Sequence, residues 1–529
     1  MTQTSKWKAC STRVALIAAS AIVLASAGAQ ADDSVVFTTK GAVKGTVATT
    51  YRAFLGIPYA APPMGNLRWK APQAAASWTG TRSATTAGSV CPQQGFNPDG
   101  TVSTRGAEDC LYLNVYTPYP LSTAKLPVMI WIHGGAFVGG SGSDYDPSIL
   151  AKKANAVVVT LNYRLGALGF LAHPALTAES GDSSGNFGLL DQQAAIGWVK
   201  TNVANFGGDV TKTTLFGESA GGASVWANVI SPKVANLFQR AIVESGAGFG
   251  FTTLATAEAN GKTFAANVGC TDTTSAAAAC LRSVSLSAVL AGAGGSGSSL
   301  AALPWTPTVG GAVLPKKPKD AFAAGTYNKV PILQGSNHDE GRLFAAFNYD
   351  LAGNPLTAAS YQSLVNQWFG SSASSVLSQY PAANYSSPSL AYATLFTDAV
   401  FACPARTINR AISSAVNVYA YEFNDTAAPA AFSDPYFPLG AYHGAEVQYI
   451  FQAADTSSFT SAQLALSNQM IKYWAAFAAT GNSNATGLPA WTKYSVSADQ
   501  VLSFAPSSTA PLGTFAADHK CAFWATLGY

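Results

Sequence analysis

The sequence predicts an α/β fold, built around a large and mostly parallel central sheet with helices on its faces. Short apolar or β-branched stretches bounded by Gly, Pro or Asn occur at residues 128–133, 156–163 and 213–216, as expected for strands buried on both faces. Between them, residues 191–203 carry apolar side chains at helical spacing. Because strand and helix alternate along the chain, the α/β class follows.

The N-terminus has the pattern of an export signal. Three basic residues precede an apolar run over 14–27, and the small residues Ala-Gln-Ala follow at 29–31. We predict cleavage after Ala31, which leaves residues 32–529 as one catalytic domain, periplasmic or secreted. A membrane anchor is the alternative, but the run is short for a bilayer span.

The composition restricts the class of partner. Apolar residues make up 48% of the 529 and charged residues 11%, which excludes global disorder. Removing residues 1–31 takes away three of the 30 Lys and Arg and none of the 27 Asp and Glu, so the mature chain is formally neutral. A neutral chain without a basic cluster excludes nucleic acid and anionic lipid as expected partners and favours an uncharged small molecule. The oligomeric state is not indicated by any pattern.

The mature chain contains six cysteines, an even number that predicts disulfides in an exported protein. Their spacing favours two local pairs, Cys91–Cys110 and Cys270–Cys280, which leaves Cys403 and Cys521 as the third. A zinc site is the alternative, but none of these cysteines has the two-to-four-residue spacing or the paired histidines of such sites. No metal is therefore expected.

Residues 217–221, Gly-Glu-Ser-Ala-Gly, follow the strand at 213–216 and precede a helix that we expect to start near Gly222. This strand-turn-helix setting of a Gly-x-Ser-x-Gly motif predicts a nucleophile elbow, which lifts the hydroxyl of Ser219 above the sheet edge. The two glycines avoid collisions between Cβ atoms and the neighbouring backbone.

The strand at 128–133 runs into His-Gly-Gly-Ala-Phe at residues 133–137, a loop of the kind that supplies backbone N–H donors to an oxyanion hole. The amides of Gly135, Ala136 and Ala220 would give three donors. His133 is expected to brace this loop rather than to transfer protons.

Several blocks in the same order resemble the type-B carboxylesterases of the cholinesterase, carboxylesterase and lipase family. They are Phe-Leu-Gly-Ile-Pro-Tyr-Ala at 54–60, Glu-Asp-Cys-Leu-Tyr-Leu-Asn-Val at 108–115, Asn-Tyr-Arg at 162–164, Gly-Asn-Phe-Gly-Leu-Leu-Asp-Gln at 185–192 and Asn-Phe-Gly-Gly-Asp at 205–209. The resemblance implies an α/β-hydrolase fold and a serine esterase without metal or organic cofactor. It also implies the same three disulfides that the spacing favours.

The remaining site residues follow from chain order and from this resemblance. In α/β-hydrolases the acid and then the histidine follow the serine along the chain, so the candidates for the catalytic histidine are His338, His443 and His519. Residues 442–446 are similar to the family's histidine loop, and this favours His443. The segment 335–341 resembles the family's acid loop and assigns Glu340, with Asp339 as the alternative. Ser245 resembles a serine that supports the acid.

For three other carboxylates near these motifs, the sequence does not assign a specific catalytic role. Glu218, beside the nucleophile, either tunes the charge of the histidine or is a buried structural carboxylate. Asp434 and Glu446 are read as loop or helix-cap residues.

The resemblance implies hydrolysis of small to medium uncharged esters through an acyl-enzyme on Ser219. Phe96 is the only aromatic residue between Cys91 and Cys110, so the chain lacks there the tryptophan that binds choline in cholinesterases, and choline esters are not expected. Trp305 and the aromatic residues at 432–437 are candidates either for the substrate pocket or for the core. The alternatives are a lipase or polyester hydrolase of the same mechanism and, in another class, a non-catalytic binding or adhesion protein on this fold.

Two further segments affect the domain organisation and the local packing. Residues 291–302 are rich in Gly, Ser and Ala and are read as a loop rather than an interdomain linker. Gly310 stands where family members usually carry an aspartate, so the packing there is expected to differ.

Overall fold

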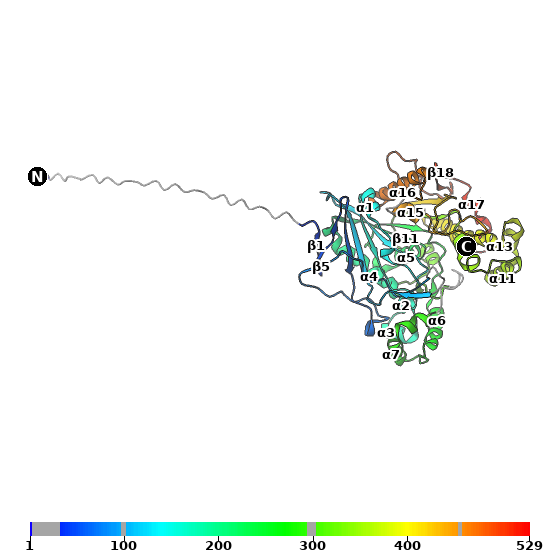
Figure 1. The fold of residues 1–529 in the computed structure, drawn as a ribbon, viewed down its shortest axis with the longest axis horizontal. Coiled ribbons are helices and arrows are strands. Elements are labelled where there is room, and N and C mark those ends of the chain that lie inside the picture. Colours follow the sequence, from blue (N-terminus) through cyan, green and yellow to red (C-terminus); the bar gives the residue numbers. More distant parts are fainter. Residues whose placement is uncertain (3–31, 97–101, 294–302, 453–456, 529) are drawn as a thin grey trace. The chain divides into compact units, whose positions relative to one another are not determined.

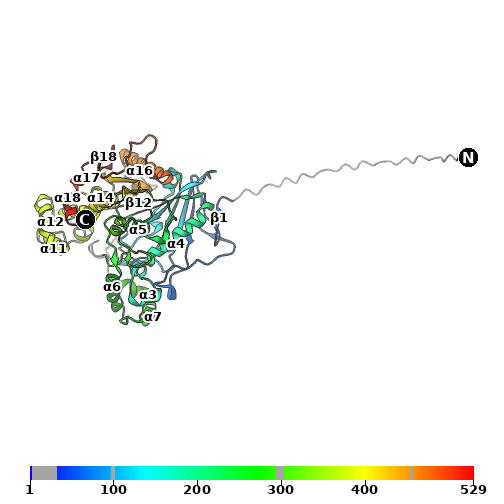
Figure 2. The ribbon, with the colours of Figure 1, turned by 180° about the vertical axis from the view of Figure 1, so that it is seen from behind.

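A large mixed sheet dominates the computed structural model, which describes residues 1–2, 32–96, 102–293, 303–452 and 457–528. In this part of the chain, 11 strands join in the order β18-β17-β16-β15-β12-β11-β9-β10-β8-β4-β3. Neighbours from β17 to β10 run parallel, and the outer pairs are antiparallel. The sheet runs through the middle of the unit that starts at Ser34, with helices on both sides (Figures 1 and 2). The prediction of an α/β fold with a mostly parallel centre is therefore confirmed.

Most inner strands are short, as their sequence predicts, but β11 has 11 residues and begins at Gly208, five residues before the stretch predicted at 213–216. The inner strands are β9 (Leu126–Ile132), β10 (Val157–Leu161), β11 (Gly208–Glu218), β12 (Arg240–Glu244), β15 (Ile332–Asn337), β16 (Val418–Phe423) and β17 (Val501–Ala505). The edge strands are β3 (Thr46–Val47), β4 (Tyr51–Pro58), β8 (Tyr112–Pro118) and β18 (Ser508–Leu512).

Each face of the sheet packs against its own hydrophobic core. Successive side chains of a strand point to opposite faces. In β9, Val128, Ile130 and Ile132 enter a core that includes side chains of α4 (Phe187–Asn202) and α5 (Ala220–Ile230). Met129 and Trp131 enter the other, with α1 (Ser148–Ala154) and α16 (Ser461–Thr480). Because helices cover both faces, β9 is apolar along its whole length.

Some predicted boundaries differ from the structure. Helix α5 begins at Ala220 and not near Gly222, because the turn at Ser219 leads directly into it. Helix α8 (Leu286–Gly292) includes the first two residues of the segment read as a loop; the Ser285 hydroxyl caps its start and Val289 is buried beneath it. The rest of that segment from residue 294, and the predicted export signal at 3–31, lie outside the described residues.

The three predicted disulfides are present. They join Cys91 to Cys110, Cys270 to Cys280 and Cys403 to Cys521. The first closes a loop that carries the hairpin of β6 (Gln93–Phe96) and β7 (Val102–Arg105).

In the described part of the chain, no single helix is long and apolar enough to cross a bilayer. One pair, α7 (Ser275–Ser283) and α8, reaches that length and hydropathy only when its two helices are taken together, and the chain bends by 110° between them.

Candidate active site

The site lies where the parallel strands β9, β11, β12 and β15 end at one edge of the sheet. Ser219 follows β11 with φ 59° and ψ −125°, and its amide donates to the Glu244 carbonyl at 2.9 Å. A Cβ atom at Gly221 would lie 2.0 Å from the carbonyl oxygen of Ile132, and one at Gly217 would lie 2.6 Å from it. Only glycine therefore allows the turn to approach β9 this closely, and the result is the sharp strand-to-helix turn that the motif predicts.

Three side chains from distant segments meet at this turn. The Ser219 Oγ lies 2.8 Å from His443 Nε2, and His443 Nδ1 lies 2.5 Å from Glu340 Oε2. All three are buried, with Glu340 fully so and the other two at 6–7% exposure. Serine, imidazole and carboxylate thus form a continuous hydrogen-bonded chain, the arrangement in which an imidazole can accept the serine proton.

Glu340, rather than Asp339, reaches the imidazole. The second oxygen of Glu340 accepts the backbone amide of Asn337 at 2.8 Å. Asp339 turns away to an ion pair with Arg342 at 2.8 Å and accepts the Ala441 amide at 3.0 Å. The latter bond holds the loop that carries His443, so Asp339 has a structural place beside the site.

Two aromatic rings flank His443 that the sequence reasoning did not identify. Phe344 and Phe401 each lie with their ring centroids 4.9 Å from that of the imidazole. Neither ring belongs to a recognisable sequence motif. Phe401 comes from η9 (Thr397–Ala402), more than 40 positions before the histidine. Both restrict the ring to the orientation that joins Ser219 and Glu340.

The loop after β9 has the backbone conformation of a tight turn. Gly135, Ala136 and Phe137 all have positive φ, at 101°, 53° and 62°, and the amides of Val138 and Gly139 both donate to the Gly135 carbonyl. In the described part of the chain, the amides of Gly135, Ala136 and Ala220 donate to no protein acceptor. Such unused donors beside a serine are what an oxyanion site requires.

His133 is buried at the start of this loop. Its Nδ1 lies 2.8 Å from the Gly134 carbonyl, and its ring stacks on Tyr163 with centroids 4.4 Å apart. Burial lowers the pKa of His133 to about 4, so the ring is neutral at physiological pH. The contacts are those of a brace for the loop.

A group of buried glutamates surrounds the histidine. Glu218 Oε1 lies 3.2 Å from His443 Nε2, Glu244 accepts the Trp474 indole N–H at 2.9 Å, and Glu446 binds the Asn337 side chain. Burial raises the pKa of all three carboxyls, to about 8 for Glu244 and well above the usual range for Glu218 and Glu446, where neighbouring glutamates add to the effect. Burial thus disfavours the ionised form of each of these three carboxyls.

Glu446 is the N-cap residue of α15 (Val447–Phe451), as expected, but its side chain makes no capping hydrogen bond. Its carboxyl is instead fully buried and bonded to the Asn337 side chain. Ser245 is buried with φ 51°, but in the described part of the chain its hydroxyl has no hydrogen-bond partner, so no bond joins it to Glu340. By contrast, Asp434 is a loop residue, as expected, and accepts the amides of Tyr436 and Phe437.

Two cavities adjoin the site. One, of about 790 Å³, borders Glu218, Tyr442 and Gly444, whereas the other, of about 230 Å³, lies between Gly135 and Trp305. Trp305 thus both lines a cavity and packs in the core, where its ring meets Phe264 edge to face at 5.6 Å.

The aromatic residues at 432–437 divide between surface and core. Phe432 contacts Tyr442 with centroids 6.5 Å apart, Tyr436 is exposed and Phe437 is buried. Of these three aromatic residues, Phe432 is the one that contacts Tyr442, which lines the larger cavity.

Gly310 has φ 129°, a conformation that favours glycine. Its amide donates to the Leu314 carbonyl at 3.0 Å. Glycine therefore suits the backbone conformation at this position.

Comparison with known proteins gives a consistent result. A family model described as the carboxylesterase family matches residues 32–524. Fumonisin B1 esterase of Sphingopyxis macrogoltabida is 37% identical over 483 residues, which are 88% of this chain and 85% of that protein. Carboxylesterase 1E of Mus musculus is 36% identical over 515 residues, 89% of this chain and 90% of the relative. Among solved structures, a PNB esterase matches with a TM-score of 0.80 and 32% identity, over 93% of this chain and 100% of its own.

Proposed function

Because this chain belongs to the carboxylesterase family and is a carboxylic ester hydrolase, we propose that it is a serine esterase with Ser219 as nucleophile, His443 as general base and Glu340 as the orienting acid. The observation that supports this is the unbroken chain of contacts from Ser219 Oγ to His443 at 2.8 Å and on to Glu340 at 2.5 Å. An imidazole in such a chain accepts the serine proton and so makes the hydroxyl nucleophilic at neutral pH.

The reaction is an acyl transfer in two halves. His443 Nε2 takes the proton of Ser219 while Oγ attacks the ester carbonyl carbon, and the imidazolium is stabilised by Glu340 at Nδ1. The same proton then passes to the departing alkoxide, which leaves as the alcohol. In the second half, water attacks the acyl-enzyme with His443 again as base and releases the carboxylic acid.

The negative charge of each tetrahedral intermediate falls on the former carbonyl oxygen. We assign its stabilisation to the amides of Gly135, Ala136 and Ala220, which have no protein acceptor in the described part of the chain. Ala220 is the first residue of α5, so the helix dipole adds to the effect. Loss of one such donor costs about 3 kcal/mol of barrier in comparable sites.

The expected substrates are uncharged esters of small to medium size. The cavity beside Gly135 is small and mostly walled by aliphatic side chains and Trp305, and apolar walls of this kind favour uncharged groups. The wider cleft behind Glu218 leaves room for a larger second half of the ester.

Export is part of the proposal. Its support is the set of three disulfides in a chain of this size, since such bonds persist in oxidising compartments. The basic and apolar pattern of residues 1–31 provides a second line of support.

Hydrolysis of a p-nitrophenyl ester series of increasing acyl length tests the mechanism, with the mature protein and its Ser219→Ala variant at equal concentration and matched circular dichroism. We expect the variant to lose at least about 10⁴-fold in kcat, and the wild type to prefer short and medium chains. Equal activity of the two proteins would exclude the serine mechanism. Higher turnover of emulsified long-chain triglycerides or of a polyester film would replace the substrate assignment with a lipase or polyester hydrolase, and inactivity on all esters would favour a binding protein.

A further inference from the structure

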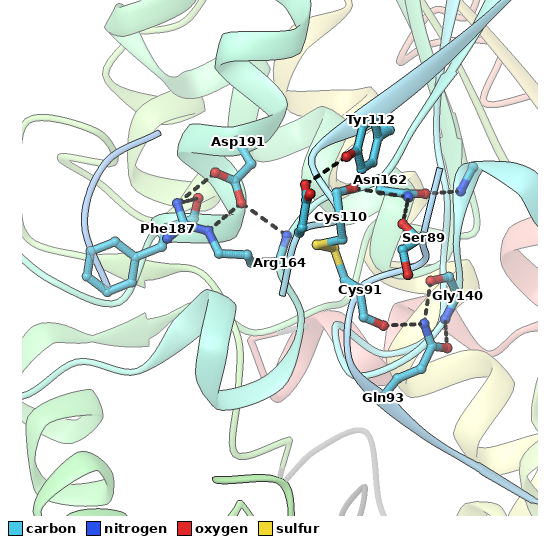
Figure 3. The surroundings of a disulfide bond; sticks show 12 residues. Ser89, Cys91, Gln93, Cys110, Tyr112, Gly140, Asn162, Arg164, Phe187 and Asp191 are labelled. Carbon is cyan, nitrogen blue, oxygen red and sulfur yellow. Dashed lines mark hydrogen bonds and ion pairs between the residues drawn. A yellow bond between two sulfur atoms is a disulfide. The ribbon is translucent and has the colours of Figure 1, made fainter. Parts of the chain in front are cut away.

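The loop that carries Gly135 and Ala136 is held from outside by a glutamine that no motif identified. Gln93 opens β6, two residues after Cys91, and is 2% exposed. Its Oε1 accepts the Gly140 amide at 2.9 Å, and its Nε2 donates to the Gly140 carbonyl at 3.0 Å. One side chain thus pairs with both backbone groups of one glycine (Figure 3).

The orientation of this amide is determined by its other partners. Nε2 also donates to the Cys91 carbonyl at 3.0 Å, and Oε1 also accepts from Arg105 Nη2 at 3.0 Å. The amide therefore meets two carbonyl oxygens on its NH₂ side and two N–H donors on its oxygen side. Only a glutamine supplies this combination of donor and acceptor at this reach.

Gly140 transmits the restraint to the oxyanion loop. It has φ 97°, and a Cβ atom there would lie 2.5 Å from His133 Nδ1 and 2.7 Å from the Gly134 carbonyl oxygen. Gly140 is therefore packed directly against the first residues of the loop. The loop is also closed internally, because the Gly139 amide donates to the Gly135 carbonyl at 3.0 Å. A shift of Gly140 would move the amide of Gly135.

A second amide acts in parallel on the next turn. Asn162 Oδ1 accepts the Gly142 amide at 2.9 Å, and its Nδ2 donates to the carbonyls of Ser89 and Cys110. Gln93 and Asn162 thus tie the segment at 140–142 to the backbone around the Cys91–Cys110 disulfide, as Figure 3 shows.

We propose that Gln93 is a positioning residue of the esterase, which holds the oxyanion-loop amides at the place where the substrate oxygen becomes negative. This inference rests on the serine mechanism proposed above. Gln93 also borders the 230 Å³ cavity that the proposed function assigns to the substrate. Preorganised donors stabilise the transition state more than the ground state, so loss of Gln93 lowers kcat by a larger factor than it raises KM.

The test uses the full mature protein and the variants Gln93→Met and Gln93→Glu. Methionine keeps the length but makes none of the four bonds. Glutamate keeps an oxygen that accepts from the Gly140 amide and from Arg105, which preserves the local fold. Its second oxygen, however, faces the carbonyl oxygens of Gly140 and Cys91. The matched control is Gln334→Met, because Gln334 is another fully buried glutamine, whose amide binds the Ala405 carbonyl and Asn409 in α14 (Cys403–Ile412).

Three quantities are measured for each protein: kcat and KM on a p-nitrophenyl ester, the inhibition constant of an alkyl trifluoromethyl ketone, and the midpoint of thermal unfolding. The ketone forms a hemiketal oxyanion on the serine and so reports on the oxyanion donors, which a loss of stability alone would not alter. In both Gln93 variants we expect kcat to fall by about 10- to 100-fold, the ketone affinity to fall by a similar factor, and KM to stay within about threefold. Gln334→Met should lower the unfolding midpoint and leave kcat and ketone affinity unchanged.

Folded Gln93 variants with wild-type kcat and ketone affinity would overturn the inference, and so would an equal loss of kcat in Gln334→Met. A wild-type enzyme that the ketone does not inhibit, together with an active Ser219→Ala variant, would instead overturn the serine mechanism itself. If Gln93→Met fails to fold, Gln93→Glu decides by the same criteria.

Discussion

At the scale of single residues, Glu218 is a second carboxyl beside the histidine. Its carboxyl is buried, lies 3.2 Å from His443 Nε2 and has a pKa well above the usual range of glutamate, because of burial and the neighbouring Glu340 and Glu244. Because its ionised form is disfavoured, Glu218 competes less than an exposed carboxylate would for the imidazolium.

This predicts a mild effect of Glu218→Gln at neutral pH. The variant exchanges a neutral carboxyl for a neutral amide of the same shape, so kcat/KM on an uncharged ester should change by no more than about fivefold at pH 7, the value of one neutral hydrogen bond. As pH rises through the raised pKa, Glu218 of the wild type ionises and favours the imidazolium, and the two profiles should separate. The measurement is kcat/KM from pH 6 to pH 10 with both proteins. A loss of more than about 100-fold at pH 7 would show that Glu218 is charged in the working enzyme.

At the scale of elements, a second buried imidazole links a strand to a helix. His519, just before α18 (Cys521–Thr526), places Nδ1 2.6 Å from Asp398 in η9 and Nε2 2.5 Å from Glu422 in β16. Although burial opposes the charge, the two carboxylates raise the pKa of His519 to about 10. The imidazolium thus holds the C-terminal segment against the sheet through a buried charge cluster.

Removal of this imidazole should destabilise the fold. His519→Gln leaves two buried carboxylates without their cation, which costs about 3–5 kcal/mol for buried ion pairs. Because the folded pKa lies above the unfolded value of 6.5, the stabilisation is complete below pH 6.5 and is lost as pH rises to about 10. Denaturant unfolding of both proteins at pH 6, 8 and 10 should therefore show a difference that shrinks with pH. His338→Gln is the control, since His338 is 42% exposed and its ring lies beside that of His519. A gap of the same size at every pH would contradict this account.

At the scale of the whole molecule, the disulfides differ in how much chain they constrain. Cys403–Cys521 closes a separation of 118 residues, whereas Cys270–Cys280 closes 10. The longer loop restricts the unfolded chain more. In the chain-entropy model a disulfide that closes a loop of 100 residues stabilises the fold by about 4.7 kcal/mol, and one that closes a loop shorter than 15 residues by less than about 3 kcal/mol.

We therefore expect the double variant Cys403→Ala, Cys521→Ala to lose more stability than Cys270→Ala, Cys280→Ala, by about 2 kcal/mol. The measurement is the free energy of unfolding in urea for the mature protein and both variants. Both should keep esterase activity when folded, because neither bond contacts Ser219 or His443. Equal losses would mean that native-state contacts, rather than the loop entropy, decide the contribution of each disulfide.

Local sequence determines much of the framework. The glycines around Ser219 predict a turn that no other residue could make against Ile132, and the short apolar segments predict buried parallel strands, because both are properties of a few consecutive residues. Strand ends were less accurate. The stretch predicted at 128–133 ends as a strand at Ile132, where the chain turns into the oxyanion loop.

Tertiary structure decided what depends on residues far apart in the chain. The bond from Ser219 to His443 spans 224 positions, that from His443 to Glu340 spans 103, and that from Gln93 to Gly140 spans 47. The raised pKa of Glu218 and the burial of Glu446 depend likewise on which groups surround each side chain. The same holds for the Ser245 hydroxyl, which has no hydrogen-bond partner among the described residues. Chain geometry acts between neighbours in sequence, whereas burial and electrostatics act between neighbours in space, and only the folded chain defines the latter.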